Sequence, residues 1–293
     1  MSALKERASS AILGRYQLNT KVNAMRQWLR VTWLVLAFMG ALSHTYLHAQ
    51  TEPKNAGIVL LHGKWGAPHG NIKSLADALK AHGYEVTTPF MPWSTKRGYD
   101  APYPVAINEL DDIVLKLRAK GLQRVYVMGT SFGANGSVAH AAYGKQAIDG
   151  VIAIAPGHTI ELPSTSQLYK KSLATAANMV KAGKGEELET FTDFNSGKRR
   201  DIAMKASVFV SYFDPNGWAS MSLSAKNVSQ KIPLLVLIGG PHDLTAQLGK
   251  AYFFSSWPQH PKSAYAILEG AEHFTAPEFA IAPVLKWLSE AQN

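Results

Sequence analysis

The sequence predicts an α/β fold with a mostly parallel, doubly wound sheet, and three features predict it. Short, uniformly apolar runs such as GIVLL at residues 57–61 are typical of strands buried on both faces. Segments with helical spacing of their apolar residues alternate with these runs. Glycines such as Gly83 and Gly121 stand where the helical spacing stops. Strands that alternate with helices imply right-handed crossovers and parallel pairing.

The predicted elements follow one another in a regular order along the chain. Ile72, Leu75 and Leu79 share one face of the first helix. The following strand, at 84–90, is ended by Pro89 and Pro92, because proline cannot donate to a strand ladder. We expect strands at residues 57–61, 84–90, 124–128, 150–155, 234–238 and 264–268, and helices at 71–82, 104–120, 134–143, 245–255 and 278–290.

The interval 157–230 breaks this alternation. A helix is predicted at 164–182, where Ser164-x-x-Gln167 has the form of a capping box, and a polar stretch follows at 183–200. An interval of this length between two core strands is too long for a loop. We therefore expect an inserted helical cap, or lid, over one edge of the sheet.

The composition is that of a globular protein. The chain has 293 residues, of which 46% are hydrophobic and 17% are charged, so it can bury a substantial core. It contains no cysteine, which excludes disulfides, thiolate metal sites and cysteine nucleophiles. No spacing of histidines indicates a metal site, and nothing in the sequence implies a cofactor.

The positive charge is spread unevenly along the chain. Net charge is +9; residues 1–49 hold six Lys and Arg against Glu6, or +5, which leaves +4 for the remainder. The one basic cluster in that remainder, Lys198-Arg199-Arg200, is too short to indicate nucleic-acid binding. A net charge of +4 on residues 50–293 does not indicate a nucleic-acid partner, and it slightly favours anionic substrates.

Residues 1–49 have the pattern of a targeting segment. The apolar run at 31–42 follows Arg26 and Arg30, and Leu47-x-Ala49 is an acceptable processing site. We expect a cleaved signal peptide and therefore an exported bacterial protein, periplasmic or secreted.

The alternative is an uncleaved membrane anchor at residues 31–47, although about 20 apolar residues are needed to span a bilayer. Met25 is a second possible start, since a compact signal begins there. In either case the predicted folded domain is residues 50–293, and its oligomeric state stays open.

The stretch Gly129-Thr130-Ser131-Phe132-Gly133 joins a predicted strand directly to a predicted helix. Such a junction demands a sharp turn, and a residue at its apex takes a strained backbone conformation. Glycines on either side remove side chains where strand and helix would collide. The pattern therefore predicts that Ser131 is exposed at the tip of the turn.

Here the chain resembles the α/β-hydrolase family, and three further stretches match it in order over residues 56–290. His62-Gly63-Lys64-Trp65-Gly66 follows the first strand, where the family has its oxyanion loop. Gly239-Gly240-Pro241-His242-Asp243 and Gly270-Ala271-Glu272-His273-Phe274 follow later strands, where the family carries its acid and its histidine. Strand ends of an open α/β sheet are where ligands gather. The resemblance identifies a superfamily and leaves the subfamily open.

The resemblance implies a Ser131-His273-Asp243 triad. His273 is then the base that takes the Ser131 proton, and Asp243 orients the imidazole. The backbone N–H groups of Phe132 and Lys64 are the implied oxyanion donors, with Trp65 as a weaker alternative to Lys64. In this scheme the Lys64 charge is either incidental or used for substrate binding.

Several of these residues have a second interpretation. Asp243 is well placed to cap the helix that begins after it, and Asp214 is an alternative acid in a turn-like segment. The pair His242-Asp243 resembles a metal-binding pair but lacks helical partner histidines. His62 is expected to pack behind the oxyanion loop.

The residues expected beside the substrate are Trp65 and His158. Trp93 and Trp218 are further candidates for a pocket wall, although core or surface packing explains each of these tryptophans equally well.

The favoured function is hydrolysis of a carboxylic ester, or less readily a thioester or amide, through an acyl-enzyme. The alternative is a non-catalytic α/β-hydrolase-like binding protein of the cell envelope. An intact set of three triad residues favours the enzyme. Specificity is expected to reside in the 157–230 insertion and in the loops at 64–70 and 91–103, none of which indicates a substrate or an acyl-chain length.

Overall fold

The structure is a computed structural model that describes residues 54–240 and 243–292. The predicted targeting segment at 1–49 and His242 lie outside the described residues. Within the described part of the chain, no helix combines the length and the apolar character that crossing a membrane requires.

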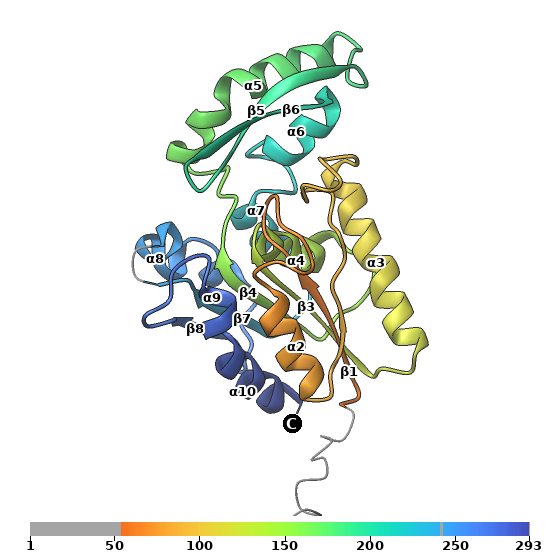
Figure 1. Cartoon of the computed structure of the whole chain (residues 1–293), viewed down its shortest axis with the longest axis vertical. Helices are drawn as coiled ribbons and strands as arrows, with labels where there is room; N and C mark the ends of the chain where they lie inside the picture. Colours follow the sequence, from red (N-terminus) through yellow and green to blue (C-terminus); the bar gives the residue numbers. More distant parts are fainter. Residues whose placement is uncertain (1–53, 241–242, 293) are drawn as a thin grey trace, which may run out of the picture. The chain divides into compact units, whose positions relative to one another are not determined.

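A six-stranded parallel sheet forms the centre of the described fold (Figure 1). Its strand order is β2-β1-β3-β4-β7-β8, and every neighbouring pair is parallel. This confirms the predicted α/β, doubly wound fold. The strands are β1 (Ala56–Leu61), β2 (Glu85–Thr87), β3 (Arg124–Ser131), β4 (Gly150–Pro156), β7 (Leu234–Ile238) and β8 (Ala264–Ile267).

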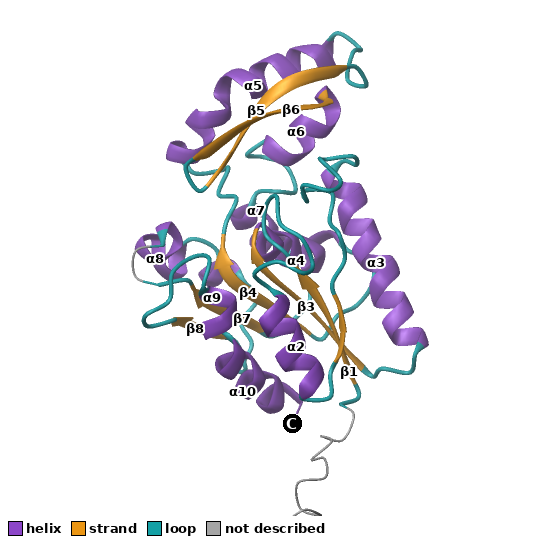
Figure 2. Ribbon diagram, viewed as in Figure 1, coloured by secondary structure: helices purple, strands orange, loops and turns teal. Residues whose placement is uncertain are grey.

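Helices cover both faces of the sheet, and the inner strands are apolar on both faces for that reason (Figure 2). Val125 and Val127 of β3 belong to one core cluster, whereas Tyr126 and Met128 belong to the other. The first cluster includes residues of α3 (Tyr103–Ala119) and α4 (Phe132–Tyr143). The second includes residues of α2 (Lys73–Ala81), α9 (Ala276–Phe279) and α10 (Ile281–Gln292).

The sheet has its topological switch point between β1 and β3. From β1 the chain proceeds to one edge through β2, and from β3 it proceeds to the other edge through β4. At such a point the loops after the two strands diverge and leave a crevice at their carboxyl ends. The loop after β1 (residues 62–66, hereafter the β1 loop) and Ser131 at the end of β3 therefore lie side by side.

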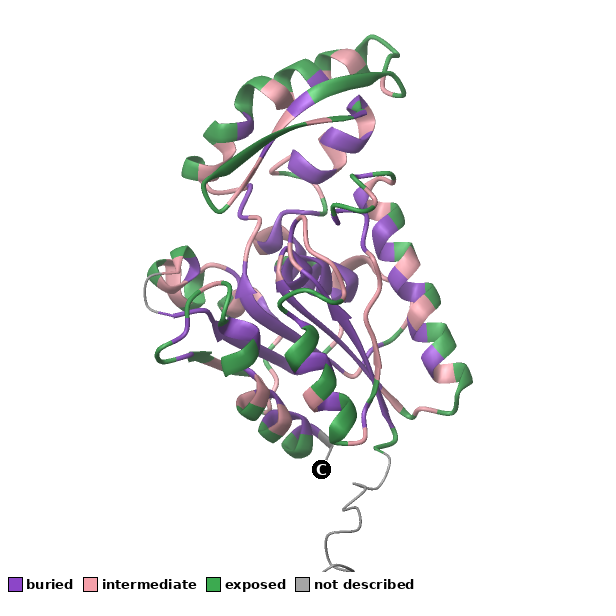
Figure 3. Cartoon of the chain, viewed as in Figure 1, coloured by how far each residue is buried: buried purple, intermediate pink, exposed green. Residues whose placement is uncertain are grey.

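The insertion (residues 157–230) differs from the predicted helical cap. It contains the helix α5 (Pro163–Lys181), but the polar stretch that follows is an antiparallel hairpin (Figures 1 and 3). The hairpin consists of β5 (Leu188–Asn195) and β6 (Lys198–Lys205). Ser196 and Gly197 form its turn with φ of 48° and 76°, the left-handed values that two-residue hairpin turns require. The helices α6 (Ala206–Phe213) and α7 (Met221–Asn227) complete the insertion.

Three smaller predictions were wrong. The predicted capping box is not made, because α5 begins at Pro163 and its N-cap is Leu162, with no side-chain cap. The helix expected at 245–255 is α8 (Leu244–Leu248) followed by two short 3₁₀ turns, since Gly249 has a φ of 61°. The helix expected at 278–290 is divided into α9 and α10.

Candidate active site

Ser131 occupies a strained turn at the junction of β3 and α4. Its φ of 54° and ψ of −120° are unusual for a residue with a side chain. A Cβ at Gly129 would overlap the backbone of Gly133, and one at Gly133 would overlap the backbone of Leu61. The two glycines are therefore needed for the close approach of strand and helix that projects Ser131.

The structure brings Ser131, His273 and Asp243 together. The Ser131 hydroxyl lies 3.0 Å from His273 Nε2, and His273 Nδ1 lies 2.8 Å from Asp243 Oδ2. Asp243 follows β7 and His273 follows β8, so all three side chains come from carboxyl ends of parallel strands. With Nδ1–H donated to Asp243, Nε2 is free to accept the serine proton.

Asp243 has both of the roles that the sequence allowed. Its Oδ1 accepts hydrogen bonds from the N–H and the hydroxyl of Thr245, at 3.0 and 2.9 Å, and so caps α8. Burial raises the pKa of Asp243, but the hydrogen bonds from His273 and Thr245 lower it by more, so the carboxylate stays charged. By contrast, Asp214 accepts the N–H of Asn216 at 2.9 Å in a turn.

His62, the first residue of the β1 loop, is buried, in line with the structural role that the sequence suggested. Its Nδ1–H donates to the Gly63 carbonyl at 2.8 Å, and its Nε2 accepts the N–H of Met91 at 3.1 Å. Burial lowers the pKa of His62, against a smaller opposite effect of the Gly63 carbonyl. A neutral imidazole thus satisfies both neighbours and holds the β1 loop to the segment before α3.

The backbone amides of the predicted oxyanion donors differ in availability. The N–H of Trp65 donates to the Trp93 carbonyl at 2.8 Å, so it is already used. The N–H of Lys64 has no acceptor among the described residues. Phe132 is the first residue of α4, where backbone N–H groups have no acceptor within the helix. Of the three predicted donors, Lys64 and Phe132 therefore have N–H groups without an acceptor among the described residues.

Ser131 and His273 line two cavities. The large cavity has a volume of about 640 Å³ and the small cavity about 310 Å³. Side chains that line the large cavity include Phe132, His158, Leu168, Tyr169, Phe194 and Leu244. Side chains that line the small cavity include Trp65, Asn71, Asn195, Lys198, Arg200 and Phe274.

His158 lies in the wall of the large cavity, stacked on Phe132 with ring centroids 3.8 Å apart. Its Nε2–H donates to the Tyr212 carbonyl at 2.7 Å, and its Nδ1 has no partner among the described residues. Burial, together with the nearby Lys64 charge, holds the pKa of His158 well below its ordinary value. The neutral His158 ring therefore has Nδ1 as a buried acceptor that no described residue bonds.

The tryptophans have three different positions. Trp65 lines the small cavity, apart from the apolar residues of the large one. Trp93 is fully buried in the core, where its indole N–H donates to the His62 carbonyl at 2.9 Å. Trp218 is partly exposed and stacks on Tyr143, with centroids 4.4 Å apart. Trp93 and Trp218 line neither cavity.

Asp193 of the hairpin is a central residue that the sequence analysis missed. It is fully buried and accepts four side-chain donors: Lys64 Nζ at 2.7 Å, Trp65 Nε1 at 2.8 Å, the Tyr99 hydroxyl at 2.8 Å and the Tyr169 hydroxyl at 3.2 Å. We call these five residues the Asp193 cluster. They come from the β1 loop, the 91–103 loop, α5 and β5, so the cluster joins the insertion to the loop beside Ser131.

The Lys64 ammonium is therefore neither incidental nor available to substrate. It also donates to the Phe194 carbonyl at 3.0 Å. Burial lowers the pKa of Lys64, but Asp193 and Tyr169 raise it by more, so it lies above its ordinary value. The side chain is a buried, charged link between the β1 loop and the hairpin. Its only sequence signal was its place in a motif that the family uses for a backbone amide.

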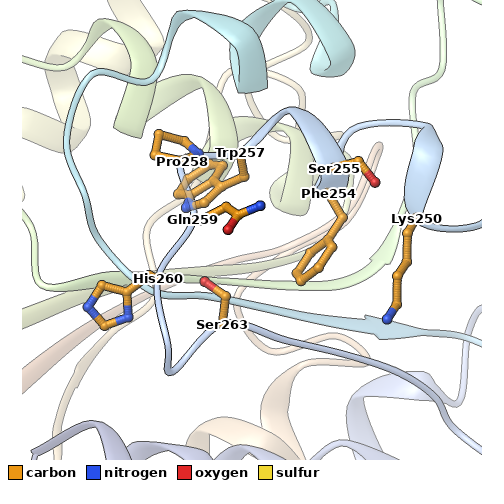
Figure 4. A pocket seen from close by; sticks show the side chains of 8 residues that line it. All are labelled: Lys250, Phe254, Ser255, Trp257, Pro258, Gln259, His260 and Ser263. Carbon is orange, nitrogen blue, oxygen red and sulfur yellow. The ribbon is translucent and has the colours of Figure 1, made fainter.

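A third hollow lies apart from Ser131 and contains none of the predicted site residues (Figure 4). Its volume is about 300 Å³, and Lys250, Phe254, Trp257 and His260 are among the residues that line it. Among the residues that the structure describes, no three His, Cys, Asp or Glu side chains gather in a way that could hold a metal ion.

Known proteins share this fold. A monoglyceride lipase from Saccharomyces cerevisiae, solved with a substrate analogue, is 16% identical with a TM-score of 0.60, over 83% of this chain and 89% of that one. A monoacylglycerol lipase from Paleococcus ferrophilus is 19% identical with a TM-score of 0.57, over 82% and 96% of the two chains. A protein from Butyrivibrio proteoclasticus with bound ferulic acid is 16% identical with a TM-score of 0.54, over 81% and 90%. At these identities the likeness shows the fold alone.

Sequence comparison is more specific about the family. No curated protein matches the chain. A family model described as serine aminopeptidase, S33, matches residues 52–278, which is more than half of the chain. The match confirms the resemblance to α/β-hydrolases and covers the whole sheet, the insertion and the residues around Ser131. The chain belongs to the serine aminopeptidase S33 family of the α/β-hydrolases.

Proposed function

We propose that the protein is a serine hydrolase that cleaves carboxylic esters through an acyl-enzyme on Ser131. The observation that carries the proposal is the chain of two hydrogen bonds from Ser131 through His273 to Asp243, at 3.0 and 2.8 Å. A serine hydroxyl is a poor nucleophile unless a base lies within hydrogen-bond reach. The S33 family match supports the same chemistry.

In the proposed mechanism the Ser131 oxygen attacks the ester carbonyl carbon while His273 Nε2 takes the hydroxyl proton. The tetrahedral intermediate then collapses, the bond to the alcohol oxygen breaks, and His273 returns the proton to that oxygen. Water attacks the remaining acyl-enzyme with His273 again as base, which releases the acid and restores Ser131. Asp243 stabilises the imidazolium in both halves of the reaction.

The developing oxyanion would be bound by the N–H groups of Lys64 and Phe132. Phe132 follows Ser131 and Lys64 lines the same two cavities, and neither amide has an acceptor in the described part of the chain. Fixed donors at this position stabilise charge that appears only in the transition state. The buried Lys64 side chain contributes indirectly, since its bonds to Asp193 and Phe194 hold the residue that provides one of these donors.

The lining of the two cavities supports an ester rather than the N-terminus of a peptide. An aminopeptidase must hold a protonated α-amine, for which a carboxylate is the natural partner. Among the described residues that line the two cavities, Asp243 is the only carboxylate, and its oxygens are bonded to His273 and Thr245. Lys198 and Arg200 would repel such an amine.

The first test is intact-mass labelling of the full chain with a fluorophosphonate probe. We expect one adduct on the wild type and none on Ser131→Ala or His273→Ala. The control is His260→Ala, which changes a histidine remote from Ser131 in the wall of the third hollow. Para-nitrophenyl esters and an aminoacyl para-nitroanilide then compare ester with amide cleavage.

No adduct on folded wild-type protein would contradict the proposal. The alternative, a non-catalytic binding protein of the cell envelope, would then be favoured. Faster cleavage of the anilide than of the esters would instead favour a peptidase within the same mechanism.

We also propose that residues 1–49 direct export. The basic, apolar and processing segments of this stretch support the proposal. Mass analysis of the protein from fractionated bacterial cells tests it, with an expected N-terminus just after Ala49 in the periplasm or medium. A full-length chain in the membrane fraction would instead indicate an anchor.

A further inference from the structure

The small cavity beside Ser131 is lined by two cationic side chains that have no acidic partner among the described residues. Lys198 and Arg200 of β6 line this cavity and are exposed. The other cations of β6 do have partners, since Arg199 pairs with Asp201 at 3.0 Å and Lys205 with Glu186 at 2.9 Å. Neither Lys198 nor Arg200 has a carboxylate within ion-pair distance in the described part of the chain.

The geometry of the hairpin directs both cations to the same side. Residues two apart on a strand share a face, so Lys198 and Arg200 point together and Arg199 points away. Arg200 pairs across the hairpin with Asp193, which places its side chain on the inner face beside the Asp193 cluster. On the outer face Arg199 meets Thr192 and Asp201.

The Arg200 guanidinium lies over the Trp65 ring, 4.3 Å from its centroid. Trp65 is itself fixed, since its indole N–H donates to Asp193 and its backbone N–H to Trp93. Stacking uses the face of a guanidinium and leaves the N–H donors at its edge free to bind a carboxylate or phosphate in bidentate fashion. Trp65 thus works as a platform that orients Arg200.

The remaining lining groups suit an anion and offer it no competition. Asn71 and Asn195 add neutral amides to the small cavity. The Lys64 charge is already balanced by Asp193, and none of the described residues that line the small cavity is acidic. The large cavity has the apolar side chains Phe132, Leu168 and Leu244, which suit an acyl chain.

We propose that the small cavity is a subsite for an anionic group, a carboxylate or a phosphate, on the alcohol part of the ester. This inference rests on the proposed ester hydrolysis and adds its substrate class. The acyl chain occupies the large cavity, and the leaving alcohol carries its anion to Arg200 and Lys198. His273 lines both cavities, so it can protonate the leaving oxygen between them.

The test compares para-butyryloxybenzoate with its neutral methyl ester in the full chain. We expect Arg200→Gln to lower kcat/KM for the anionic ester about tenfold, since a charge-assisted bidentate bond is lost, and to leave the neutral ester nearly unchanged. Lys198→Gln should act in the same direction by about threefold. Arg200→Lys should fall between wild type and Arg200→Gln, because it keeps the charge without the planar donors.

Arg199→Gln is the matched control, because it removes the same charge from the same strand on the opposite face. It should leave the ratio of the two rates unchanged. A parallel arm with para-butyryloxyphenyl phosphate distinguishes the two anions. The anion that the subsite prefers is the one whose ester loses more kcat/KM in Arg200→Gln. High salt should reduce the preference in the wild type.

Two results would overturn the inference without touching the proposed function. One is an equal loss for the anionic and neutral esters in Arg200→Gln. The other is a loss confined to esters with the charge on the acyl side, such as phenyl hemiglutarate against phenyl valerate. Failure of the proposed function is distinct, because the neutral esters and the fluorophosphonate probe would then not react at all.

Discussion

The sheet and the hairpin of the insertion are built on opposite principles. The interior positions of β3 are all buried, whereas β6 is mostly exposed and carries a cation at several positions (Figure 3). The sheet provides the three residues of the proposed chemistry, Ser131, Asp243 and His273. The hairpin provides Lys198 and Arg200, which the proposed anion subsite uses. The reacting groups thus lie at the ends of rigidly packed strands, whereas the residues proposed to select the substrate lie on an exposed element whose sequence can vary.

The two regions meet at the Asp193 cluster. Asp193 lies on β5, yet two of its donors, Lys64 and Trp65, belong to the β1 loop of the sheet. The Asn195 side chain adds a bond to the Lys64 carbonyl at 3.1 Å. A change in the hairpin therefore reaches the proposed oxyanion donor through a few short, buried contacts.

The largest expected effect is a difference in stability between a Gly→Ala substitution in the sheet and one in the insertion. Gly129→Ala would push a Cβ into the backbone of Gly133, where neither strand nor helix can yield. We expect a loss of about 4 kcal/mol or more in the free energy of unfolding, or no folded protein. Gly185→Ala in the insertion meets Ser207 and Val180 at 3.4 and 3.5 Å, which is ordinary contact.

Chemical denaturation of both variants measures the difference. Gly185→Ala should stay within about 0.5 kcal/mol of the wild type. Similar losses in the two variants would show that the insertion is packed as tightly as the sheet.

The next largest effect concerns the Asp193 cluster, where the hairpin meets the β1 loop. Asp193→Asn keeps the shape of the side chain but leaves the buried Lys64 ammonium without its counter-charge. Removing one partner of a buried ion pair is expected to cost about 3 kcal/mol of unfolding free energy. We also expect kcat to fall, because the β1 loop loses its anchor.

Asp201→Asn is the control within the same hairpin. Asp201 pairs with Arg199 on the exposed outer face, where solvent screens the ion pair, so its loss should change the unfolding free energy little. Lys64→Met combined with Asp193→Asn should recover part of the stability, since no buried charge is then left unpaired. Equal effects of Asp193→Asn and Asp201→Asn would contradict the role of the cluster.

A third change acts on the reaction with little effect on the fold. A Cβ at Gly157 would stand 2.8 Å from the Ser131 hydroxyl oxygen. Gly157→Ala should therefore lower kcat/KM about 100-fold by displacing the nucleophile, while the unfolding free energy changes by about 1 kcal/mol or less. Steady-state kinetics with a neutral ester, beside a denaturation curve, provide both values. Unchanged kinetics would show that Ser131 can move away from the methyl group.

The core of the fold was readable from sequence because the four inner strands of the sheet, β1, β3, β4 and β7, are buried on both faces. That burial leaves uninterrupted apolar runs, such as residues 57–61 and 234–238, and β1 and β7 lie there. The meeting of Ser131, Asp243 and His273 was predictable for a related reason: parallel strands bring their carboxyl ends to one edge. The sequence also predicted a structural His62 and the capping role of Asp243.

The hairpin was missed because its pattern is weak. β5 and β6 carry many polar residues on exposed faces, and the signal that remained was the Ser196-Gly197 turn. Asp193 was missed because its partners lie far from it in sequence: Lys64 is 129 residues away. Long-range polar contacts leave no periodicity in a single sequence, so the Asp193 cluster becomes visible only in the folded structure.

The smallest effect is a difference in how the stability of the sheet region and that of the Asp193 cluster depend on pH. In the sheet region, burial raises the pKa of Asp111, but the hydrogen bonds from His140 and from two backbone N–H groups lower it by more. The pKa of Asp243 is lowered in a similar way. A carboxyl with a lowered pKa stabilises the fold above its unfolded pKa of about 4, and this contribution is lost as the pH falls through the lowered value.

In the Asp193 cluster the pKa shifts have the opposite sign, so stability is lost at high pH. Burial and the Asp193 charge hold the pKa of Tyr99 well above its ordinary value, and the pKa of Lys64 is raised as well. Groups with raised pKa values contribute fully below their unfolded values of about 10, and the contribution is lost as the pH rises through the folded values. Each such proton changes the unfolding free energy by about 1.4 kcal/mol per pH unit within that window.

Hydrogen exchange followed by mass spectrometry, with urea titrations at each pH, can observe the two regions separately. In acid, below about pH 4, protection should be lost first around α3, α4 and the Ser131 site. In alkali, above about pH 10, it should be lost first in the insertion. Tyr99→Phe removes one of the alkaline groups and should reduce the alkaline slope without changing the acid one. If protection in alkali were instead lost first around α3 and α4, deprotonation of Lys64 and Tyr99 would not control the attachment of the insertion, and the predicted difference between the two regions would be absent.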